Sequence, residues 1–230
     1  PVICNLSRLS VKRKDKEMRV LTPLERESLI GILMEDMDSF KFGVFLALYT
    51  GIRIGELCAL QWKDIDFARA TLKVRKTIQR IQNTDSHATS KTKIVISEPK
   101  SKSSIREIPL TSSIMEIAWK FVSFPDSYIL TGTGRYIEPR TMQNHFKLYV
   151  KQSGISDANF HALRHTFATR CVKVGFEIKS LSEILGHASV LGRIRVGVKG
   201  NVIRHKLSES SYKTRLCGEI YPSGIGKTDR

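Results

Sequence analysis

The chain has 230 residues, 41% of them hydrophobic and 26% charged, which is the composition of an ordinary globular protein. No apolar run approaches the ~20 residues of a transmembrane helix, which argues against a membrane-spanning protein. The 38 lysines and arginines against 22 acidic residues give a formal net charge of +16, which favours a polyanionic partner, with nucleic acid ahead of an anionic membrane surface. The four cysteines are widely spaced and form no CxxC pair, so we expect reduced thiols in a cytosolic protein rather than a zinc knuckle or a disulfide framework.

Residues 1–20 are predicted to be a basic linker. Positions 12–16 are all charged and lack apolar periodicity. A solvated tail and a basic strap that lies along phosphates both fit this pattern. Because the chain begins at Pro1 rather than at a methionine, we expect a fragment whose N-terminal part is missing.

Three helices are expected next. Thr22-Pro23-Leu24-Glu25 combines a capping threonine, a proline at the first helical position and a glutamate at the third, the pattern that begins a helix. A second helix is predicted from about residue 40 to residue 50, where Gly51 ends it. A third, short helix is predicted from Arg53 to about Gln61.

The periodicity then changes to that of strands. Residues 71–79 alternate between apolar and polar side chains, and residues 93–97 and 105–110 are predicted to be two further strands. The polar segments 83–90 and 100–104 are predicted to be the turns between them. We therefore expect a small antiparallel three-stranded meander inserted among the helices.

Helices return after the strands. Four are predicted over residues 113–122, 140–153, 159–174 and 178–185, and glycines at positions 154, 175 and 186 end the last three. From Leu191 onward the glycine-rich sequence has neither helical nor strand periodicity, so residues 191–230 are treated as a divergent tail. The sequence thus predicts a mainly helical α+β domain over residues 21–190.

Arg53 is the first candidate for a functional residue. It lies between a glycine that ends one helix and the start of the next, in Thr50-Gly51-Ile52-Arg53. A guanidinium at a helix N-terminus joins backbone amides that already favour an anion, and it can bind a phosphate through two parallel hydrogen bonds. Glu56, three residues on, is placed to hold Arg53. Taken alone, a surface Arg–Glu pair explains this pattern better.

Two further segments contain histidines. His161 and Arg164 share one helical face, and aimed at one phosphate oxygen they suit charge stabilisation and proton transfer. His161 and His165 are also spaced for zinc, but the HExxH glutamate is missing because Ala162 follows His161. His187 follows a leucine and a glycine, and a lone histidine of this kind is usually structural.

Together, the segments TGIRIGEL (50–57), HALRHTFAT (161–169) and LGH (185–187) closely resemble the motifs of tyrosine recombinases of the lambda-integrase type. The first segment continues into a leucine, a tryptophan and an aspartate, as it does in that family. The resemblance covers about residues 21–190. It implies a helical DNA breaking-rejoining catalytic domain of a site-specific recombinase or integrase, which forms a 3′-phosphotyrosine intermediate.

The resemblance also implies roles for individual residues. Arg53 and Arg164 would clamp the scissile phosphate, and His161 and His187 would assist through hydrogen bonds and proton transfer. Arginines stabilise the charge on the nonbridging oxygens without a metal. The covalent link conserves the energy of the phosphodiester, so no cofactor is expected.

A lysine on a turn among the strands completes the family's acid–base set. It would protonate the 5′ oxygen as that oxygen leaves. The corresponding turn here reads Pro-Lys-Ser-Lys-Ser-Ser, so Lys100 is the first choice and Lys102 the second. Two ordinary turn lysines explain either position equally well.

The nucleophilic tyrosine is not where the family places it. In the family it lies about ten residues beyond the LGH histidine, on a short helix of ~15 Å, but the count from His187 reaches no tyrosine. Three interpretations remain open: the reading frame is disrupted after Val190, Tyr212 is a displaced nucleophile that acts through a longer loop or in a neighbouring protomer, or the domain only binds DNA. Tyr221 is the poorer candidate.

These features lead to a set of expectations about partners. We expect double-stranded DNA as the substrate, a homotetramer on paired DNA sites, neither a membrane nor a small-molecule substrate, and a missing N-terminal DNA-binding domain. A bacterial or phage-derived enzyme of this kind would be cytoplasmic and associated with the nucleoid. An inactive DNA-binding module, a type IB topoisomerase-like enzyme and, more distantly, a metal-dependent nuclease are the alternatives.

Overall fold

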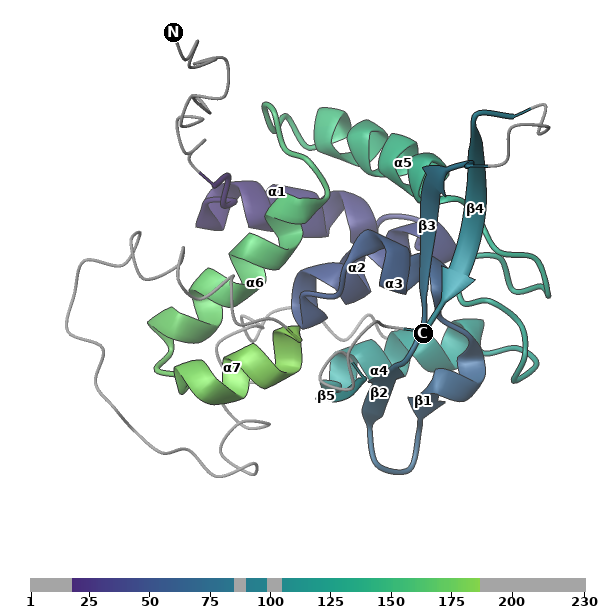
Figure 1. The fold of residues 1–230 in the computed structure, drawn as a ribbon. Helices are drawn as coiled ribbons and strands as arrows, with labels where there is room; N and C mark the ends of the chain where they lie inside the picture. Colours follow the sequence, from purple (N-terminus) through teal and green to yellow (C-terminus); the bar gives the residue numbers. More distant parts are fainter. Residues whose placement is uncertain (1–17, 85–89, 99–104, 187–230) are drawn as a thin grey trace, which may run out of the picture.

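The structure is a computed structural model that describes residues 18–84, 90–98 and 105–186 (Figure 1). In chain order these residues form α1 (Pro23–Met34), α2 (Ser39–Thr50), α3 (Ile54–Ala59), the 3₁₀ turn η1 (Trp62–Asp64), β1 (Ile65–Asp66), β2 (Thr71–Val74), β3 (Thr77–Gln82), β4 (Thr92–Ser97), β5 (Arg106–Pro109), α4 (Ser112–Phe121), α5 (Pro139–Gln152), α6 (His161–Lys173) and α7 (Ile178–Leu185). Helices dominate and the strands form small antiparallel sheets, so the predicted mainly helical α+β class is confirmed. No helix in these ranges is long and apolar enough to cross a membrane.

The predicted cap of the first helix is present. Thr22 Oγ1 accepts a hydrogen bond from the Glu25 backbone N–H (3.2 Å), and Glu25 Oε2 accepts one from the Thr22 N–H (2.8 Å). Arg19 forms an ion pair with Glu25, and the Leu21 N–H donates to Thr166 Oγ1 (2.9 Å). The chain that enters α1 is therefore tied to α6, the helix that contains the His-x-x-Arg segment.

Helix α2 is the centre of the hydrophobic core. All of residues 42–50 are buried, and a helix that is apolar on every side needs neighbours on every side. It contacts α1, α4, α5 and α6, and Figure 1 shows it between the α6–α7 pair and the strands. As predicted, α2 ends at Gly51, which is left-handed (φ 65°).

We expect Gly51→Ala to destabilise the fold by about 2–4 kcal/mol. The positive φ disfavours any side chain, and an added Cβ would lie 2.6 Å from Phe167 Cδ1 and 2.9 Å from Leu185 Cδ2. Gly132→Ala is the matched control, because Gly132 has nearly the same φ (+64°) but no atom within 4 Å of the added Cβ. The control should lose only ~1 kcal/mol. Urea unfolding followed by circular dichroism compares the two, and equal losses would contradict the close packing at Gly51.

The strand predicted over residues 71–79 is wrong, because the structure divides it into β2 and β3, which belong to different sheets. β2 pairs with β1 and β5 in an antiparallel three-stranded sheet, with Leu72 opposite Ile65 and Ile108. β3 pairs with β4 in a separate hairpin. The three-stranded sheet is thus present, but the predicted meander through residues 93–97 is wrong.

The break between β2 and β3 has a physical cause that the sequence pattern hides. Leu72 and Val74 are fully buried, and Arg75 Nε then binds Asp64 Oδ1 (2.6 Å) at the end of β2. By contrast, residues 79–82 of β3 are exposed. Both strands alternate with the same period of two, so a change of pairing partner leaves the sequence pattern unaltered.

Strand β5 brings a charged side chain into the core. Arg106 and Ile108 are buried while Glu107 is exposed, and Arg106 lies opposite Val74. Alternation along a strand sends every second side chain to the same face. Arg106 therefore occupies an inward position that would ordinarily hold an apolar residue.

Candidate active site

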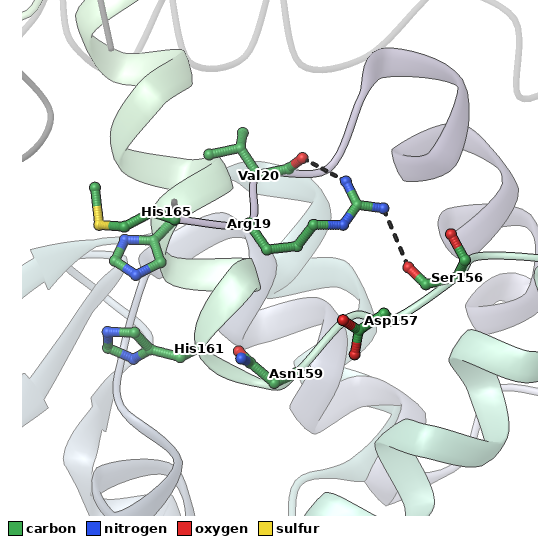
Figure 2. A pocket seen from close by; sticks show the side chains of 8 residues that line it. Arg19, Val20, Ser156, Asp157, Asn159, His161 and His165 are labelled. Carbon is green, nitrogen blue, oxygen red and sulfur yellow. Dashed lines mark hydrogen bonds between the residues drawn. The ribbon is translucent and has the colours of Figure 1, made fainter. Parts of the chain in front are cut away.

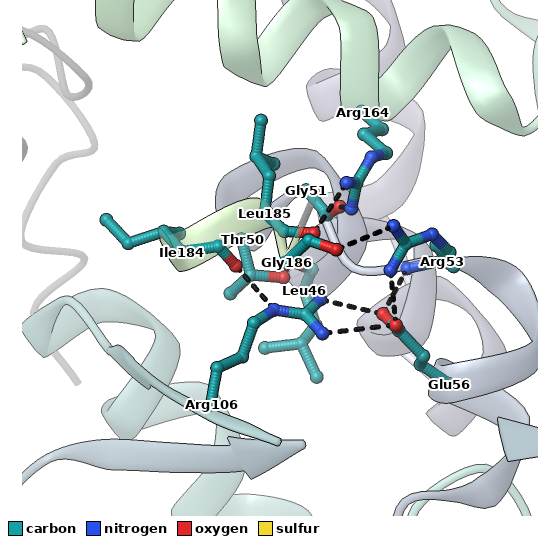
Figure 3. A network of polar contacts seen from close by, with 10 residues as sticks. All are labelled: Leu46, Thr50, Gly51, Arg53, Glu56, Arg106, Arg164, Ile184, Leu185 and Gly186. Atoms are coloured by element: carbon teal, nitrogen blue, oxygen red, sulfur yellow. Dashed lines mark hydrogen bonds and ion pairs between the residues drawn. The ribbon is translucent and has the colours of Figure 1, made fainter. Parts of the chain in front are cut away.

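The two arginines singled out in the sequence lie together at the C-terminal end of α7 (Figure 3). Arg53 is the N-cap residue of α3, and Arg164 lies in the first turn of α6. Arg53 Nη2 donates to the Gly186 carbonyl (3.3 Å), and Arg164 Nη2 donates to the Leu185 carbonyl (2.6 Å). Arg53 is thus brought to a helix end that lies 133 residues further along the chain, beside Arg164, which is 21 residues from Leu185.

The structure describes three of the predicted site residues, namely Arg53, His161 and Arg164. The remaining candidates lie outside the described residues: Lys100, Lys102, His187, Tyr212 and Tyr221.

The end of α7 binds arginines because its last carbonyls have no partner within the helix. The last four carbonyls of a helix lack intrahelical donors, and the helix dipole favours cations there. Three successive carbonyls accept a hydrogen bond from three different arginines: Ile184 from Arg106, Leu185 from Arg164, and Gly186 from Arg53. The helix end therefore orients the guanidiniums and offsets part of their mutual repulsion.

Arg164 is almost completely buried, with 1% of its surface exposed. Its Nη1 donates to the Gly51 carbonyl (2.7 Å), but its buried Nε has no hydrogen-bond partner among the described residues. Burial, and then the charge of Arg53, lowers the pKa of Arg164 to about 9, so the side chain is still cationic at pH 7. Buried donors without a partner are uncommon, and an anion at this point would satisfy the donor and offset the charge.

Glu56 is the buried counter-ion of the site. Its Oε1 accepts from Arg53 Nη1 (2.7 Å) and Arg106 Nη1 (3.1 Å), and its Oε2 accepts from the Arg53 backbone N–H (2.9 Å) and Arg106 Nη2 (2.8 Å). Burial by itself would raise the pKa of this carboxyl, but the hydrogen bonds and charge of Arg106, with the charge of Arg53, hold it below its usual range. The prediction that Glu56 holds Arg53 is confirmed.

Arg106 is the part of this network that the sequence analysis missed. Its guanidinium binds Glu56 and its Nε donates to the Ile184 carbonyl. The available signal was the alternation in residues 105–110, which places Arg106 on the same face as Ile108. A charged residue on the apolar face of a strand is rarely buried without a partner, and this pattern predicts a paired buried charge.

Of the three described candidates Arg53, His161 and Arg164, His161 is the exposed one. It is the exposed first residue of α6, and its ring packs edge-on against His165, with 4.4 Å between the ring centroids. Both histidines line a pocket of about 630 Å³ together with Arg19, Asp157 and Asn159 (Figure 2). Partial burial, followed by the charges of Arg164 and Arg53, lowers the pKa of His161 below its usual 6.5. The neutral form of His161, which can accept a proton or a hydrogen bond, is therefore favoured.

We expect NMR titration of the His161 ring to give a pKa below 6.5, so the ring becomes protonated only as the pH falls below that value. The His161→Gln variant assigns the signal. In Arg164→Gln the pKa should rise, because one of the two cations that oppose protonation is gone. A His161 pKa at or above 6.5 in the unmodified chain would contradict the effect of the two arginines.

A metal centre has little support from the part of the chain that the structure describes. There, no three His, Cys, Asp or Glu side chains gather in an arrangement that could hold a metal ion. The site's charge is instead cationic, because it contains three guanidiniums and one carboxylate, which binds two of them. Such a site suits a phosphodiester, whose developing negative charge arginines can stabilise directly.

Residues 19–191 match the family described as the phage integrase family. A tyrosine recombinase XerC-like protein of Caldanaerobacter subterraneus subsp. tengcongensis is 32% identical over 162 residues, which cover 63% of this chain and 41% of that protein. The ICEBs1 integrase of Bacillus subtilis is 26% identical over 222 residues, which cover 91% of this chain and 57% of that protein. The chain spans about half the length of the curated relatives that it matches.

Solved structures show the same fold. A Tn1549 transposon integrase in complex with circular intermediate DNA is 24% identical, with a TM-score of 0.63 over 88% of this chain and 68% of that chain. The XerA recombinase is 22% identical, with a TM-score of 0.59 over 91% of this chain and 66% of that chain. At these identities the likeness shows the fold, and it agrees with the predicted fold class.

Proposed function

This chain belongs to the phage integrase family, and on that premise we propose that it is the catalytic part of a site-specific DNA recombinase. The observation that carries the proposal is the convergence of Arg53 and Arg164 at the end of α7, with a buried, unpartnered Nε on Arg164. A phosphate placed there meets two guanidiniums and one unused donor. The site thus suits a scissile phosphodiester.

The proposed reaction is a pair of transesterifications. A tyrosine oxygen attacks phosphorus, the bond to the 5′ oxygen breaks, and the products are a 3′-phosphotyrosine and a 5′ hydroxyl. A second 5′ hydroxyl then reverses the step on a new strand. The bond energy is kept in the covalent link, so the reaction needs no cofactor.

The residue roles belong to the same proposal. Arg53 and Arg164 hold the nonbridging oxygens of the phosphate. His161, in its neutral form, accepts a hydrogen bond or a proton at the exposed edge of the site. Lys100 is proposed as the acid for the leaving 5′ oxygen, with His187 as a second donor to the phosphate. Tyr212 is the proposed nucleophile.

The partners are also part of the proposal. The net charge of +16 favours double-stranded DNA, and the Tn1549 integrase was solved with DNA. We propose a homotetramer on paired DNA sites, located in the cytoplasm at the nucleoid. Residues 21–190 would be the catalytic unit, with residues 1–20 as a basic linker and 191–230 as a separate tail.

A suicide substrate tests the proposal. The 230-residue chain is incubated with nicked duplexes that have a randomised core, so that a cleaved strand loses its short 5′-hydroxyl fragment and the covalent adduct accumulates. An adduct that survives SDS and is absent in Tyr212→Phe supports the proposal, and sequencing the trapped DNA gives the target. An adduct that persists in Tyr212→Phe assigns the nucleophile to another residue. The absence of any adduct, together with salt-sensitive binding, would identify a non-catalytic DNA-binding module instead.

A further inference from the structure

The feature that the proposed mechanism does not use is Arg106. Its side chain is 4% exposed, and it reaches from β5 to α3 and α7. Two of its N–H groups form a fork with both oxygens of Glu56, at 3.1 and 2.8 Å. Its guanidinium also packs against Gly186, where an added Cβ would lie 3.2 Å from Arg106 Nη1. Arg106 therefore touches both elements that orient Arg53 (Figure 3).

Stability alone is a poor explanation of a buried arginine at this position. Replacing a buried ion pair by apolar residues of similar volume is often neutral or stabilising, because the ions lose their hydration. The neighbouring inward position on β5 is an isoleucine, Ile108, which is fully buried. A hydrophobic side chain at position 106 would therefore pack in the core equally well. The charge of Arg106 thus calls for an explanation other than stability.

The charged side chain of Arg106 shares the Glu56 carboxylate with Arg53. Each oxygen of Glu56 accepts one hydrogen bond from Arg106 and one from Arg53. Because Arg106 occupies half of the carboxylate, a single side-chain N–H of Arg53 binds Glu56, through Nη1. Without the Arg106 fork, both oxygens are open to the Arg53 guanidinium, and bidentate pairing is the preferred geometry of arginine with a carboxylate.

We propose that Arg106 is a positioning residue that acts through Glu56 to keep the Arg53 guanidinium directed at the phosphate. The inference rests on the proposed function, since it takes Arg53 to be a phosphate ligand. Arg106 itself does not touch the DNA. Its loss turns Arg53 towards Glu56 and removes one phosphate contact.

The salt dependence of DNA binding tests this role without requiring cleavage. Each phosphate contact adds about 0.9 to the slope of log affinity against log salt concentration. The 230-residue chain is titrated against a labelled duplex of about 30 base pairs over a range of KCl concentrations, and fluorescence anisotropy reports binding. Arg53→Ala should lower the slope by about 1.

Arg106→Lys is the decisive variant, because it keeps the charge and removes the fork. We expect its slope to fall by about 1, as in Arg53→Ala, and the double variant to fall no further. Arg69→Lys is the control, since Arg69 forms an exposed pair with Asp66 outside the site, and its slope should equal that of the unmodified chain. Circular dichroism on the same samples verifies that each variant is folded. If Arg106→Lys does not fold, Arg106→Gln replaces it, and the expected slope is the same.

The outcomes separate this role from the proposed function. An unchanged slope in Arg106→Lys, or losses that add in the double variant, overturns the positioning role even if the suicide substrate gives an adduct. If the unmodified chain shows no salt-dependent binding, the proposed function fails first and this role fails with it. A lowered unfolding temperature with an unchanged slope identifies Arg106 as a purely structural residue and likewise overturns the role.

Discussion

Arg164→Lys is expected to reduce formation of the covalent DNA adduct by at least ~10³-fold. The Arg164 guanidinium bridges the Gly51 and Leu185 carbonyls through Nη1 and Nη2, and its buried Nε, which has no hydrogen-bond partner among the described residues, is the donor that we propose for the phosphate. A lysine ammonium is a point charge that cannot bridge two carbonyls and bind a third group in the same plane. The charge is kept, so the loss measures geometry.

The measurement is single-turnover adduct formation on the suicide substrate that the unmodified chain selects. Arg69→Lys is again the matched control, because Arg69 is exposed and pairs with Asp66 away from the site; its rate should equal that of the unmodified chain. Urea unfolding of Arg164→Lys verifies that the variant is folded at the assay temperature. A rate within about tenfold of the unmodified chain would contradict the central role of this guanidinium.

Glu56→Gln is expected to cost about 3–5 kcal/mol of the free energy of unfolding. Glu56 is the buried carboxylate between Arg53 and Arg106, and its removal leaves the buried Arg106 and the partly buried Arg53 without a counter-ion. An amide also offers one oxygen where the carboxylate offers two, so some of the four hydrogen bonds are lost. Urea unfolding at pH 7 measures the difference.

The same substitution should change the pH dependence of stability. The pKa of Glu56 is lower in the folded chain than its usual 4.5, so its contribution is fully present above 4.5 and is lost as the pH falls through the lower folded value. Glu56→Gln should remove that part of the acid destabilisation. Asp66→Asn, at the exposed Asp66–Arg69 pair, should leave the unfolding midpoint at pH 7 almost unchanged. If Glu56→Gln also leaves it unchanged, the carboxylate does not balance the arginines.

Much of the helical framework was predictable, because the signals that begin and end helices are local. The capping box at Thr22 and the glycines after α2 and α7 act through contacts within a few residues. The pairing of Arg53 with Glu56 was predictable for the same reason, since residues three apart on a helix start share a face. These features need no knowledge of the rest of the fold.

The strands were harder, because pairing depends on residues far away in the sequence. The break between β2 and β3 at Arg75 follows from the ion pair of Arg75 with Asp64 and from the pairing of β5 with β2 rather than with β4. A period of two is common to every strand and does not identify the strand with which it pairs. The predicted meander was wrong for this reason.

The sequence by itself determined the family of this protein and pointed to Arg53, His161 and Arg164 as residues of the proposed phosphate site, because these residues stand in short motifs of characteristic spacing. Only the tertiary structure decided how those motifs meet. The carbonyls at the end of α7 and the buried Glu56–Arg106 pair gather guanidiniums from α3, α6 and β5. Burial and long-range hydrogen bonds set that arrangement, and neither can be inferred from the spacing of residues along the chain.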